Sequence, residues 1–283
     1  MTADLIGLMW LPFLACLVLT FIHGYLGLHV IAREVIFVDI ALAQVAALGT
    51  TTAFLSGHDL DSATAYWTSL AFTLVGAVVL AFTRSRKRRV SQEAVIGVVY
   101  AVSAAASVLL IDRAPHGNEH IKAVMVGSLL AVTPTQVLKT AALYAAVGLF
   151  HWWARRPFYL ISTDPDEAAR QGLAVRWWDF LFYASFGVVV TSSVRIAGVL
   201  LVFAYLIVPG LAGLAWGTRW GARLLLGWSI AAAVSLVGIV TSAVLDIPTG
   251  ATIVCVFGLA LAALWLARRL LTAGAAASPS QVA

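Results

Sequence analysis

The residues best suited to chemistry in this sequence are an acid and an amide inside an apolar run. Asp39 and Gln44 lie five residues apart in the segment VIFVDIALAQVAALG. Five residues are about 1.4 helical turns, so the two side chains would lie on neighbouring faces of a helix. A carboxylate and an amide carbonyl can ligate a hard or borderline cation, or line a hydrated path. The alternative is that Asp39 caps or hydrogen-bonds a neighbouring helix.

Two other polar residues lie in or beside apolar runs, and structural roles are favoured for both. Glu93 follows a basic run at a predicted helix start, where the helix dipole stabilises a carboxylate. His23 lies beside Gly24, where a lone neutral histidine more often packs than binds a ligand. The signatures GxxxxGK(S/T), HExxH and GxSxG are absent from the sequence. The sequence therefore gives no positive indication of an enzyme or of ATP hydrolysis by this chain.

The composition identifies the environment in which these residues must be positioned. Hydrophobic residues make up 61% of the 283 residues, and charged residues only 11%. Soluble domains carry about 25% charged residues, so this chain could not cover its surface in water. Intrinsic disorder requires low hydrophobicity, and a transmembrane barrel requires short alternating segments. The chain is therefore predicted to be an all-α, polytopic helical membrane protein, and its net charge of +5 reflects membrane topology rather than nucleic-acid binding.

Apolar runs of about 20 residues predict the membrane spans. The sequence contains nine such runs, at residues 5–28, 36–55, 63–83, 91–111, 135–153, 177–194, 196–216, 224–245 and 249–267. Arg195 separates two of the runs, and a model with eight spans would make one of these neighbours re-entrant. The segment 121–131 is too short to cross alone and is predicted to be interfacial or re-entrant.

The basic residues predict the orientation of the chain. Nine crossings place 14 of the 18 Lys and Arg residues on one side, which the positive-inside rule assigns to the cytoplasm. The C-terminus is then cytoplasmic and the N-terminus outside. The 14 residues are Arg33, Arg84, Arg86, Lys87, Arg88, Arg89, Arg155, Arg156, Arg170, Arg176, Arg219, Arg223, Arg268 and Arg269.

The longest cytoplasmic loop is predicted to contain a short polar helix. Asp164 can cap this helix, with Pro165 at its first position and Glu167 in its first turn. Gly172 then ends it. From these residues alone, the helix either lies on the lipid headgroups or docks a cytoplasmic partner.

Several segments taken together resemble the permease subunits of ABC transporters for manganese, zinc, iron or iron chelates. Their shared order and spacing carry the resemblance, which extends from about residue 23 to about residue 270. The segments are REVIFVDIALAQVAALG, QEAVIGVVYA, EHIKAVMVGSLLAV, STDPDEAARQG, VRIAGVLLVFAYLIVPG and DIPTGATIV.

This resemblance implies a transporter subunit rather than an enzyme. It implies a homodimer in a bacterial cell (inner) membrane, with a cytoplasmic ABC ATPase dimer and an extracytoplasmic metal-binding protein as partners. The transported metal is the substrate, no permanent cofactor is implied, and ATP is hydrolysed by the partner. The short helix becomes the coupling helix to the ATPase through Asp164, Glu167, Ala168 and Gly172. Residues 1–272 form one transmembrane permease domain, and residues 273–283 form a disordered cytoplasmic tail.

The family pattern also assigns a metal path to the second span. Asp39 matches the acid of that pattern, but Gln44 stands where the family has a histidine. Losing an imidazole leaves oxygen ligands, which suit manganese or iron better than zinc. The substitution is also compatible with a chelate or a non-metal solute, and His23 is a candidate replacement for the missing imidazole.

The predicted mechanism is alternating access driven by ATP binding to the partner. Small residues at Gly198, Pro209 and Gly210 would permit the close packing and kinks that gating requires. The alternative is a proton-coupled secondary carrier or channel, in which Asp39 relays a proton or an ion without an ATPase.

Overall fold

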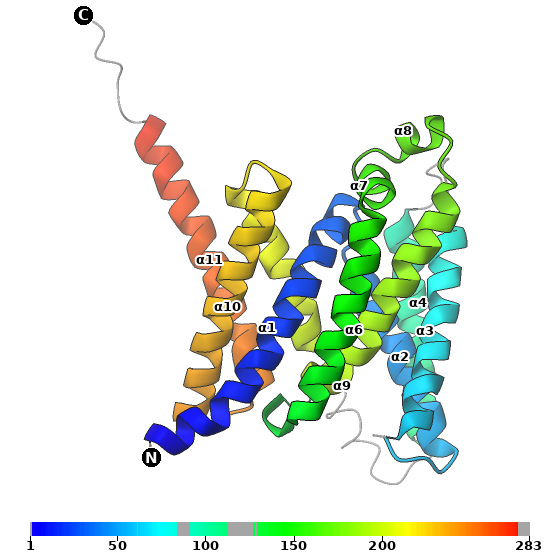
Figure 1. Ribbon diagram of the computed structural model, residues 1–283, viewed down its shortest axis with the longest axis horizontal. Coiled ribbons are helices and arrows are strands. Elements are labelled where there is room, and N and C mark those ends of the chain that lie inside the picture. The colour runs from blue at the N-terminus through cyan, green and yellow to red at the C-terminus, as the bar shows by residue number, and fades with distance from the viewer. Residues whose placement is uncertain (1, 61, 84–90, 113–126, 128, 277–283) are drawn as a thin grey trace, which may run out of the picture.

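The structure is a computed structural model that describes residues 2–60, 62–83, 91–112, 127 and 129–276. Every regular element in these ranges is a helix, which confirms the all-α class. Figure 1 shows the elements as α1 (Thr2–Ala32), α2 (Val38–Leu55), α3 (Ala63–Thr83), α4 (Gln92–Ile111), η1 (Leu129–Ala131), α6 (Pro134–Trp153), α7 (Arg155–Thr163), α8 (Pro165–Arg170), α9 (Val175–Trp216), α10 (Trp220–Leu245) and α11 (Thr249–Ala276).

Seven of the described helices are long and apolar enough to cross a membrane, namely α1, α2, α3, α4, α9, α10 and α11. Apolar side chains make these helices favourable in lipid, and the helical backbone satisfies its own polar groups there. The predicted span 135–153 corresponds to α6, which is not among the seven. Gln136, Lys139 and His151 reduce its hydropathy, although it runs beside α1 in the bundle (Figure 1).

Helix α9 contains a sharp break that divides its 42 residues into two halves. A straight helix of that length would extend about 63 Å, roughly twice the thickness of a bilayer core. Gly198 interrupts it with φ 75° and ψ 162°, a backbone conformation that favours glycine. The two halves run in opposite directions in Figure 1. They correspond to the predicted spans 177–194 and 196–216, but the break lies at Gly198 instead of Arg195.

The two halves of α9 form the centre of the bundle. Helices α1, α10 and α11 pack on α9 from one side, while α2 and α3 pack on it from the other, with α4 against α2 (Figure 1). Glycines permit the closest approaches between these helices. A Cβ atom built on Gly27 of α1 would lie 1.9 Å from the carbonyl oxygen of Leu206 in α9. One on Gly49 of α2 would lie 2.7 Å from the Cα of Ser69 in α3.

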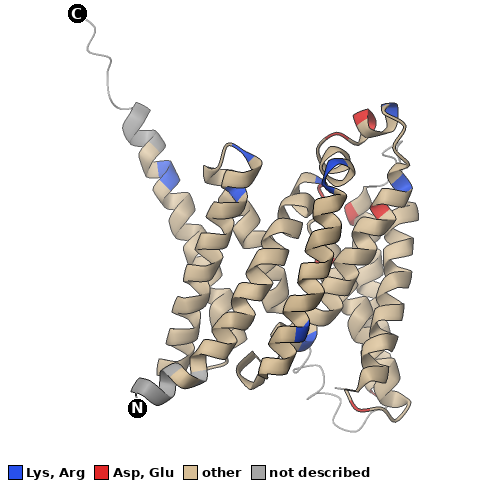
Figure 2. Ribbon diagram, in the orientation of Figure 1, with Lys and Arg blue, Asp and Glu red and all other residues tan. Residues whose placement is uncertain are grey.

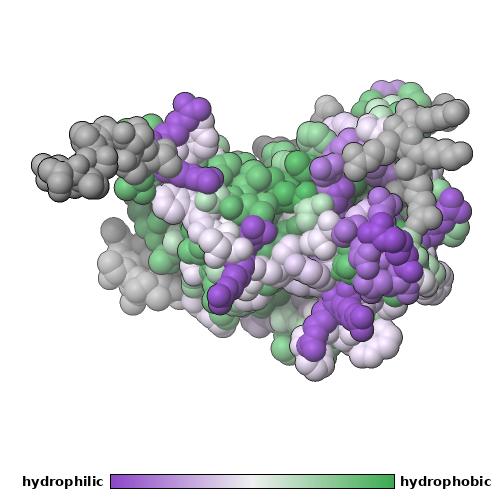
Figure 3. All heavy atoms as spheres, turned by 90° about the horizontal axis from the view of Figure 1, so that it is seen from above, coloured by the Kyte–Doolittle hydropathy of each residue, from purple (hydrophilic) through white to green (hydrophobic). Residues whose placement is uncertain are grey.

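Basic residues gather at one end of the bundle, which we call the α7–α8 end (Figure 2). The C-terminal end of α11 lies at this end, and the start of α1 lies at the opposite one (Figure 1). Viewed from the α7–α8 end, hydrophilic side chains surround a hollow with apolar side chains (Figure 3). This distribution matches the predicted charge asymmetry. Arg33 differs from a loop cation because it is only 8% exposed.

Some sequence predictions fall wholly or partly outside the described residues. The basic run 84–90 lies outside them, and of the segment 121–131 the structure describes only Gly127 and Leu129–Ala131. Helix α11 extends to Ala276, four residues into the predicted tail of 273–283. Residues 277–283 lie outside the described part of the chain.

Candidate functional site

Asp39 is a fully buried carboxylate at the start of α2. Its exposed fraction is 0%, and neither carboxylate oxygen has a hydrogen-bond partner among the described residues. The partial positive charge of the helix N-terminus stabilises the carboxylate in part. Burying a carboxylate without a partner is costly, so such a group requires a specific explanation. Binding of a transported cation is an explanation that fits a carboxylate at this position.

Gln44 lies farther along the same helix and is also buried. Helix α2 packs on α3, α4 and α9, so both candidate residues face the interior of the bundle. Alanines surround them on α2, which permits this close packing. The described residues contain no group of three His, Cys, Asp or Glu side chains arranged to hold a metal ion. Asp39 and Gln44 therefore offer isolated oxygen ligands rather than a complete coordination shell.

His23 belongs to a different part of the bundle and has two hydrogen-bond partners. Its Nδ1 lies 2.9 Å from the carbonyl oxygen of Leu19, and its Nε2 lies 3.0 Å from Oγ of Ser193. The hydroxyl of Tyr144 also hydrogen-bonds to Ser193. This cluster joins α1, α6 and α9, whereas Asp39 lies on α2. His23 would have to give up one of these hydrogen bonds in order to ligate a metal.

Glu93 lies in the first turn of α4, close to the entry of α2. Its carboxylate interacts with the backbone amides of Ile36 and Phe37, directly before α2 begins. The other carboxylate oxygen, Oε2, is buried without a hydrogen-bond partner among the described residues. Glu93 therefore connects α4 to the segment that positions Asp39.

An ion pair that the sequence analysis missed lies buried near the α7–α8 end. Arg33 Nη1 lies 2.6 Å from Oδ1 of Asp179, and the two side chains are 1% and 0% exposed. Arg33 Nε donates to Oγ of Ser162 at 2.8 Å. The guanidinium carbon lies 4.0 Å from the centre of the Phe182 ring. These contacts join the residue after α1 to α7 and α9.

Two histidines extend this ion-pair cluster. His29 Nδ1 lies 2.9 Å from the same Ser162 hydroxyl, and His151 Nε2 lies 2.8 Å from Oγ of Ser185. The His151 ring stacks on Phe158 of α7 with centroids 4.4 Å apart. Helix α7 is thus held to α1, α6 and α9 by polar and aromatic contacts. The sequence offered only a weak signal for this cluster, namely a single acid in the apolar segment RWWDFLF.

The short helix predicted in the longest loop is α8, and its predicted ends are confirmed. Asp164 accepts a hydrogen bond from the backbone amide of Glu167 at 2.8 Å, and Pro165 is the first helical residue. Gly172 follows the helix with φ 80°. Ala168 is buried and anchors α8 to the rest of the molecule. The other side of α8 is polar and exposed.

The charged residues of α8 form a local network. Glu167 accepts hydrogen bonds from Gln171 and Arg170, both at 2.8 Å. These bonds hold the pKa of Glu167 below its ordinary value of 4.5. The carboxylate consequently stays ionised and fixes the polar surface of α8.

The three predicted gating residues lie in the second half of α9. Gly198 forms the break, and Pro209 and Gly210 are buried further along. The carbonyl oxygen of Pro209 would lie 2.6 Å from a Cβ atom built on Gly227 of α10. The position of a Cβ atom on Gly210 is 2.7 Å from Cδ1 of Ile31 in α1. Gly210 and Gly227 therefore permit close contact between α9 and its neighbours, and the gating role of Gly198, Pro209 and Gly210 stays a prediction.

The chain is similar in sequence to several transport proteins. It is 24% identical over 241 residues to a probable iron transport system membrane protein of Haemophilus influenzae, covering 85% of this chain and 86% of that protein. It is 24% identical over 242 residues to the manganese transport system membrane protein MntC of Halalkalibacterium halodurans, covering 86% and 81%. Similarity extends at 23% identity to the manganese import system permease protein ScaB of Streptococcus parasanguinis, covering 82% and 81%.

The fold is also similar to solved structures. PsaBC from Streptococcus pneumoniae in complex with Fab matches with a TM-score of 0.78 at 19% identity, covering 94% of this chain and 95% of that one. An inward-facing conformation of a putative metal-chelate type ABC transporter matches with a TM-score of 0.70 at 19% identity, covering 91% and 85%. A model of the ABC 3 transport family matches residues 6–267, nearly the whole chain. The resemblance in the sequence is thus confirmed, and the chain belongs to the ABC 3 transport family.

Proposed function

We propose that the chain is the membrane-spanning subunit of an ATP-driven importer of a divalent transition metal. It works as a homodimer with a separate cytoplasmic ABC ATPase dimer and an extracytoplasmic metal-binding protein. It sits in a bacterial cell membrane with its C-terminus in the cytoplasm, and it does not itself hydrolyse ATP. The observation that carries the proposal is the unpartnered, fully buried carboxylate of Asp39 in a member of a transporter family.

Asp39 and Gln44 supply oxygen ligands to the passing ion. Oxygen ligands favour manganese or iron over zinc, which is better bound by imidazole or thiolate. Relatives named for manganese and for iron transport are consistent with this choice. Incomplete coordination suits a path, because an ion held by a complete set of protein ligands would leave slowly. A metal chelate already carries its own ligands and could pass the same residues with fewer ligands from the protein.

Helix α8 couples the chain to the ATPase. It is short, capped by Asp164, anchored through buried Ala168 and polar on its exposed side, as a docking element requires. The Arg33–Asp179 ion pair and Ser162 connect the preceding helix α7 to α1 and α9. A movement of α8 driven by ATP would therefore reach the central helix through packed polar contacts.

Metal uptake into proteoliposomes tests this proposal. The vesicles contain the chain with its ATPase, and they receive binding protein loaded with manganese, iron or zinc in separate trials. ATP-dependent accumulation of one metal, lost in Asp39→Asn, is the expected result. Asp246→Asn is the matched control. Asp246 is exposed directly after α10, at the end of the bundle opposite the α7–α8 end, and its αL backbone accepts asparagine.

Two further variants separate the candidate ligands. Gln44→His restores the imidazole of the family pattern and should improve zinc uptake relative to manganese. His23→Ala should lower the thermal stability of the protein, because Ser193 loses a buried hydrogen-bond partner, while ATP-dependent uptake continues. Normal uptake by Asp39→Asn would contradict the role of Asp39 in the path.

A proton-coupled secondary carrier is the second candidate, since a buried carboxylate can also relay protons. It predicts uptake by the chain alone, driven by a pH gradient and independent of ATP. Such uptake would overturn the proposed importer. An ATP-hydrolysing complex that accumulates none of the three metals would instead assign the subunit to a chelate or a non-metal solute.

A further inference from the structure

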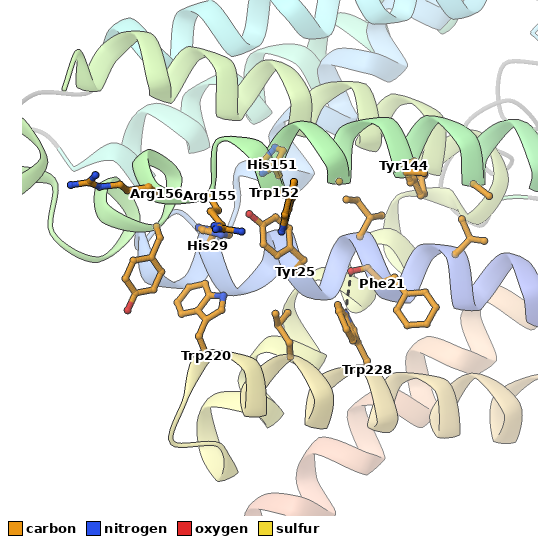
Figure 4. A pocket seen from close by; sticks show the side chains of 17 residues that line it. Phe21, Tyr25, His29, Tyr144, His151, Trp152, Arg155, Arg156, Trp220 and Trp228 are labelled. Atoms are coloured by element: carbon orange, nitrogen blue, oxygen red, sulfur yellow. Dashed lines mark hydrogen bonds between the residues drawn. The ribbon is translucent and has the colours of Figure 1, made fainter.

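A groove runs along the bundle between α6 and α10, with α1 as its floor. Its volume is about 870 Å³, and α7 lies over one end of it (Figure 4). Both wall helices pack on α1, and Trp228 Nε1 of α10 donates to the carbonyl oxygen of Phe21 at 3.1 Å. Gly148 lies in the α6 wall, and a Cβ atom built there would meet no atom within 4 Å. The groove therefore has free space beside Gly148.

The chemistry of the groove changes along its length. The part far from α7 is lined by apolar side chains, including Val18, Ile22 and Ala141. The part beneath α7 is lined by Arg155 and Arg156, both exposed. No acidic residue occurs among its described lining residues. The groove is thus cationic at the α7–α8 end and mainly apolar elsewhere, and its other polar lining residues include Tyr25, His29, Tyr144 and His151.

Aromatic residues mark the depth at which the two arginines lie. Trp152 and Trp220 line the same end of the groove (Figure 4). Tyr159 is also a lining residue and contacts Trp220. Tryptophan and tyrosine are enriched at the headgroup level of membranes, because their rings are apolar with one polar atom. The guanidinium carbon of Arg155 lies 5.2 Å from the Trp152 ring centre. The arginines therefore lie where lipid phosphates would be within reach.

We propose that this groove is a binding site for an anionic phospholipid of the leaflet at the α7–α8 end. One acyl chain lies on α1 between α6 and α10, and the headgroup phosphate binds Arg155 and Arg156. Basic pockets between membrane helices on the cytoplasmic side recognise acidic lipid headgroups in this manner. The single cationic end and the mainly apolar remainder of the groove match the shape and charge of such a lipid.

Charge argues against a second copy of this chain as the occupant. Copies in one membrane share an orientation, so the α7–α8 end of any inserted helix would meet Arg155 and Arg156. Helix α11 is among the least buried spans and carries Arg268 and Arg269 toward that end. Like charges would then face each other in the groove. A phosphate instead supplies the opposite charge.

The bound lipid would also fix the helix that leads to α8. Tyr159 of α7 makes an edge contact with Trp220 of α10, with centroids 5.2 Å apart, across the end of the groove. A headgroup held on Arg155 and Arg156 lies beside this contact. The lipid thus braces α7 against α10, independently of which solute the protein transports.

Native mass spectrometry of the purified full chain tests this site. The chain is titrated with phosphatidylglycerol and, separately, with phosphatidylcholine. Arg155→Gln and Arg156→Gln should each weaken phosphatidylglycerol binding about fivefold, and both together about 25-fold, with little change for phosphatidylcholine. Gly148→Leu should displace both lipids, because position 148 lines the groove and a Cβ atom there meets no atom within 4 Å, so the leucine side chain would occupy the groove.

Gly7→Leu is the matched control for the groove-filling variant. Gly7 lies near the opposite end of α1, and a Cβ atom there also meets nothing within 4 Å. Its lipid binding should equal that of the wild type. Unchanged phosphatidylglycerol binding in the double arginine variant or in Gly148→Leu would overturn the proposal. If Gly148→Leu loses a dimer but still binds lipid, the lipid-site proposal is overturned, and the groove is instead an interface between two copies of the chain.

Discussion

The buried pair of Arg33 and Asp179 allows a sharp test of how the α7–α8 end is held together. Asp179→Asn keeps the shape of the side chain and removes its charge. The Arg33 guanidinium, whose side chain is 1% exposed, then loses the charge of the Asp179 carboxylate. Removing one partner of a buried ion pair costs about 3–5 kcal/mol.

The surroundings of Arg33 place the expected loss at the lower end of that range. The hydrogen bond to Ser162 and the contact with the Phe182 ring remain in the variant. A desolvated cation–π contact contributes about 2 kcal/mol or more, and asparagine still offers a carbonyl oxygen. We therefore expect Asp179→Asn to lower the free energy of unfolding by about 3 kcal/mol. For a chain of this size, that corresponds to a melting temperature about 5 °C lower.

Thermal unfolding of the purified chain in one detergent measures this loss. Arg33→Met combined with Asp179→Leu removes both charges and should return to within about 1 kcal/mol of the wild type, because apolar replacement of a whole buried pair is often neutral. Asp246→Asn, at an exposed position, should leave the melting temperature unchanged. If the double variant is as unstable as Asp179→Asn, the attribution of the lost free energy of unfolding to the broken buried ion pair is refuted.

Two further predictions concern close helix packing and the charge network of α8. Gly27→Ala should lower the free energy of unfolding by about 1–3 kcal/mol, because its methyl group would overlap the Leu206 carbonyl oxygen. Gly97→Ala is the control, since a Cβ atom at position 97 meets nothing within 4 Å. In the same melting assay, this variant should raise the free energy of unfolding by up to about 1 kcal/mol. Equal effects of these two variants would contradict the packing. Carboxyl NMR titration should find the pKa of Glu167 below 4.5, moving back toward 4.5 in Arg170→Gln. Since folding lowers the pKa of Glu167, the contribution of this carboxylate to stability is present above pH 4.5 and is lost as the pH falls through the pKa of the folded state. A measured pKa at or above 4.5 would argue against the charge network of α8.

Local sequence patterns determined the features that depend on neighbouring residues. Apolar runs defined the membrane helices, because the free energy of placing a helix in lipid sums over its own side chains. Asp164, Pro165 and Gly172 defined α8 for the same reason, since helix caps act within a few residues. The ordered motifs, compared as a whole, identified the transporter family.

Tertiary structure decided the features that depend on residues far apart in the chain. Arg33 counted as a loop cation in the sequence, yet it pairs in the interior with Asp179, 146 residues away. The division of α9 was predicted at Arg195, where charge interrupts the apolar run, but it lies at Gly198, which can adopt a positive φ. The groove between α6 and α10 likewise has no local signature. Burial, pairing and empty space are set by which helices meet, and no single segment of the sequence contains that information.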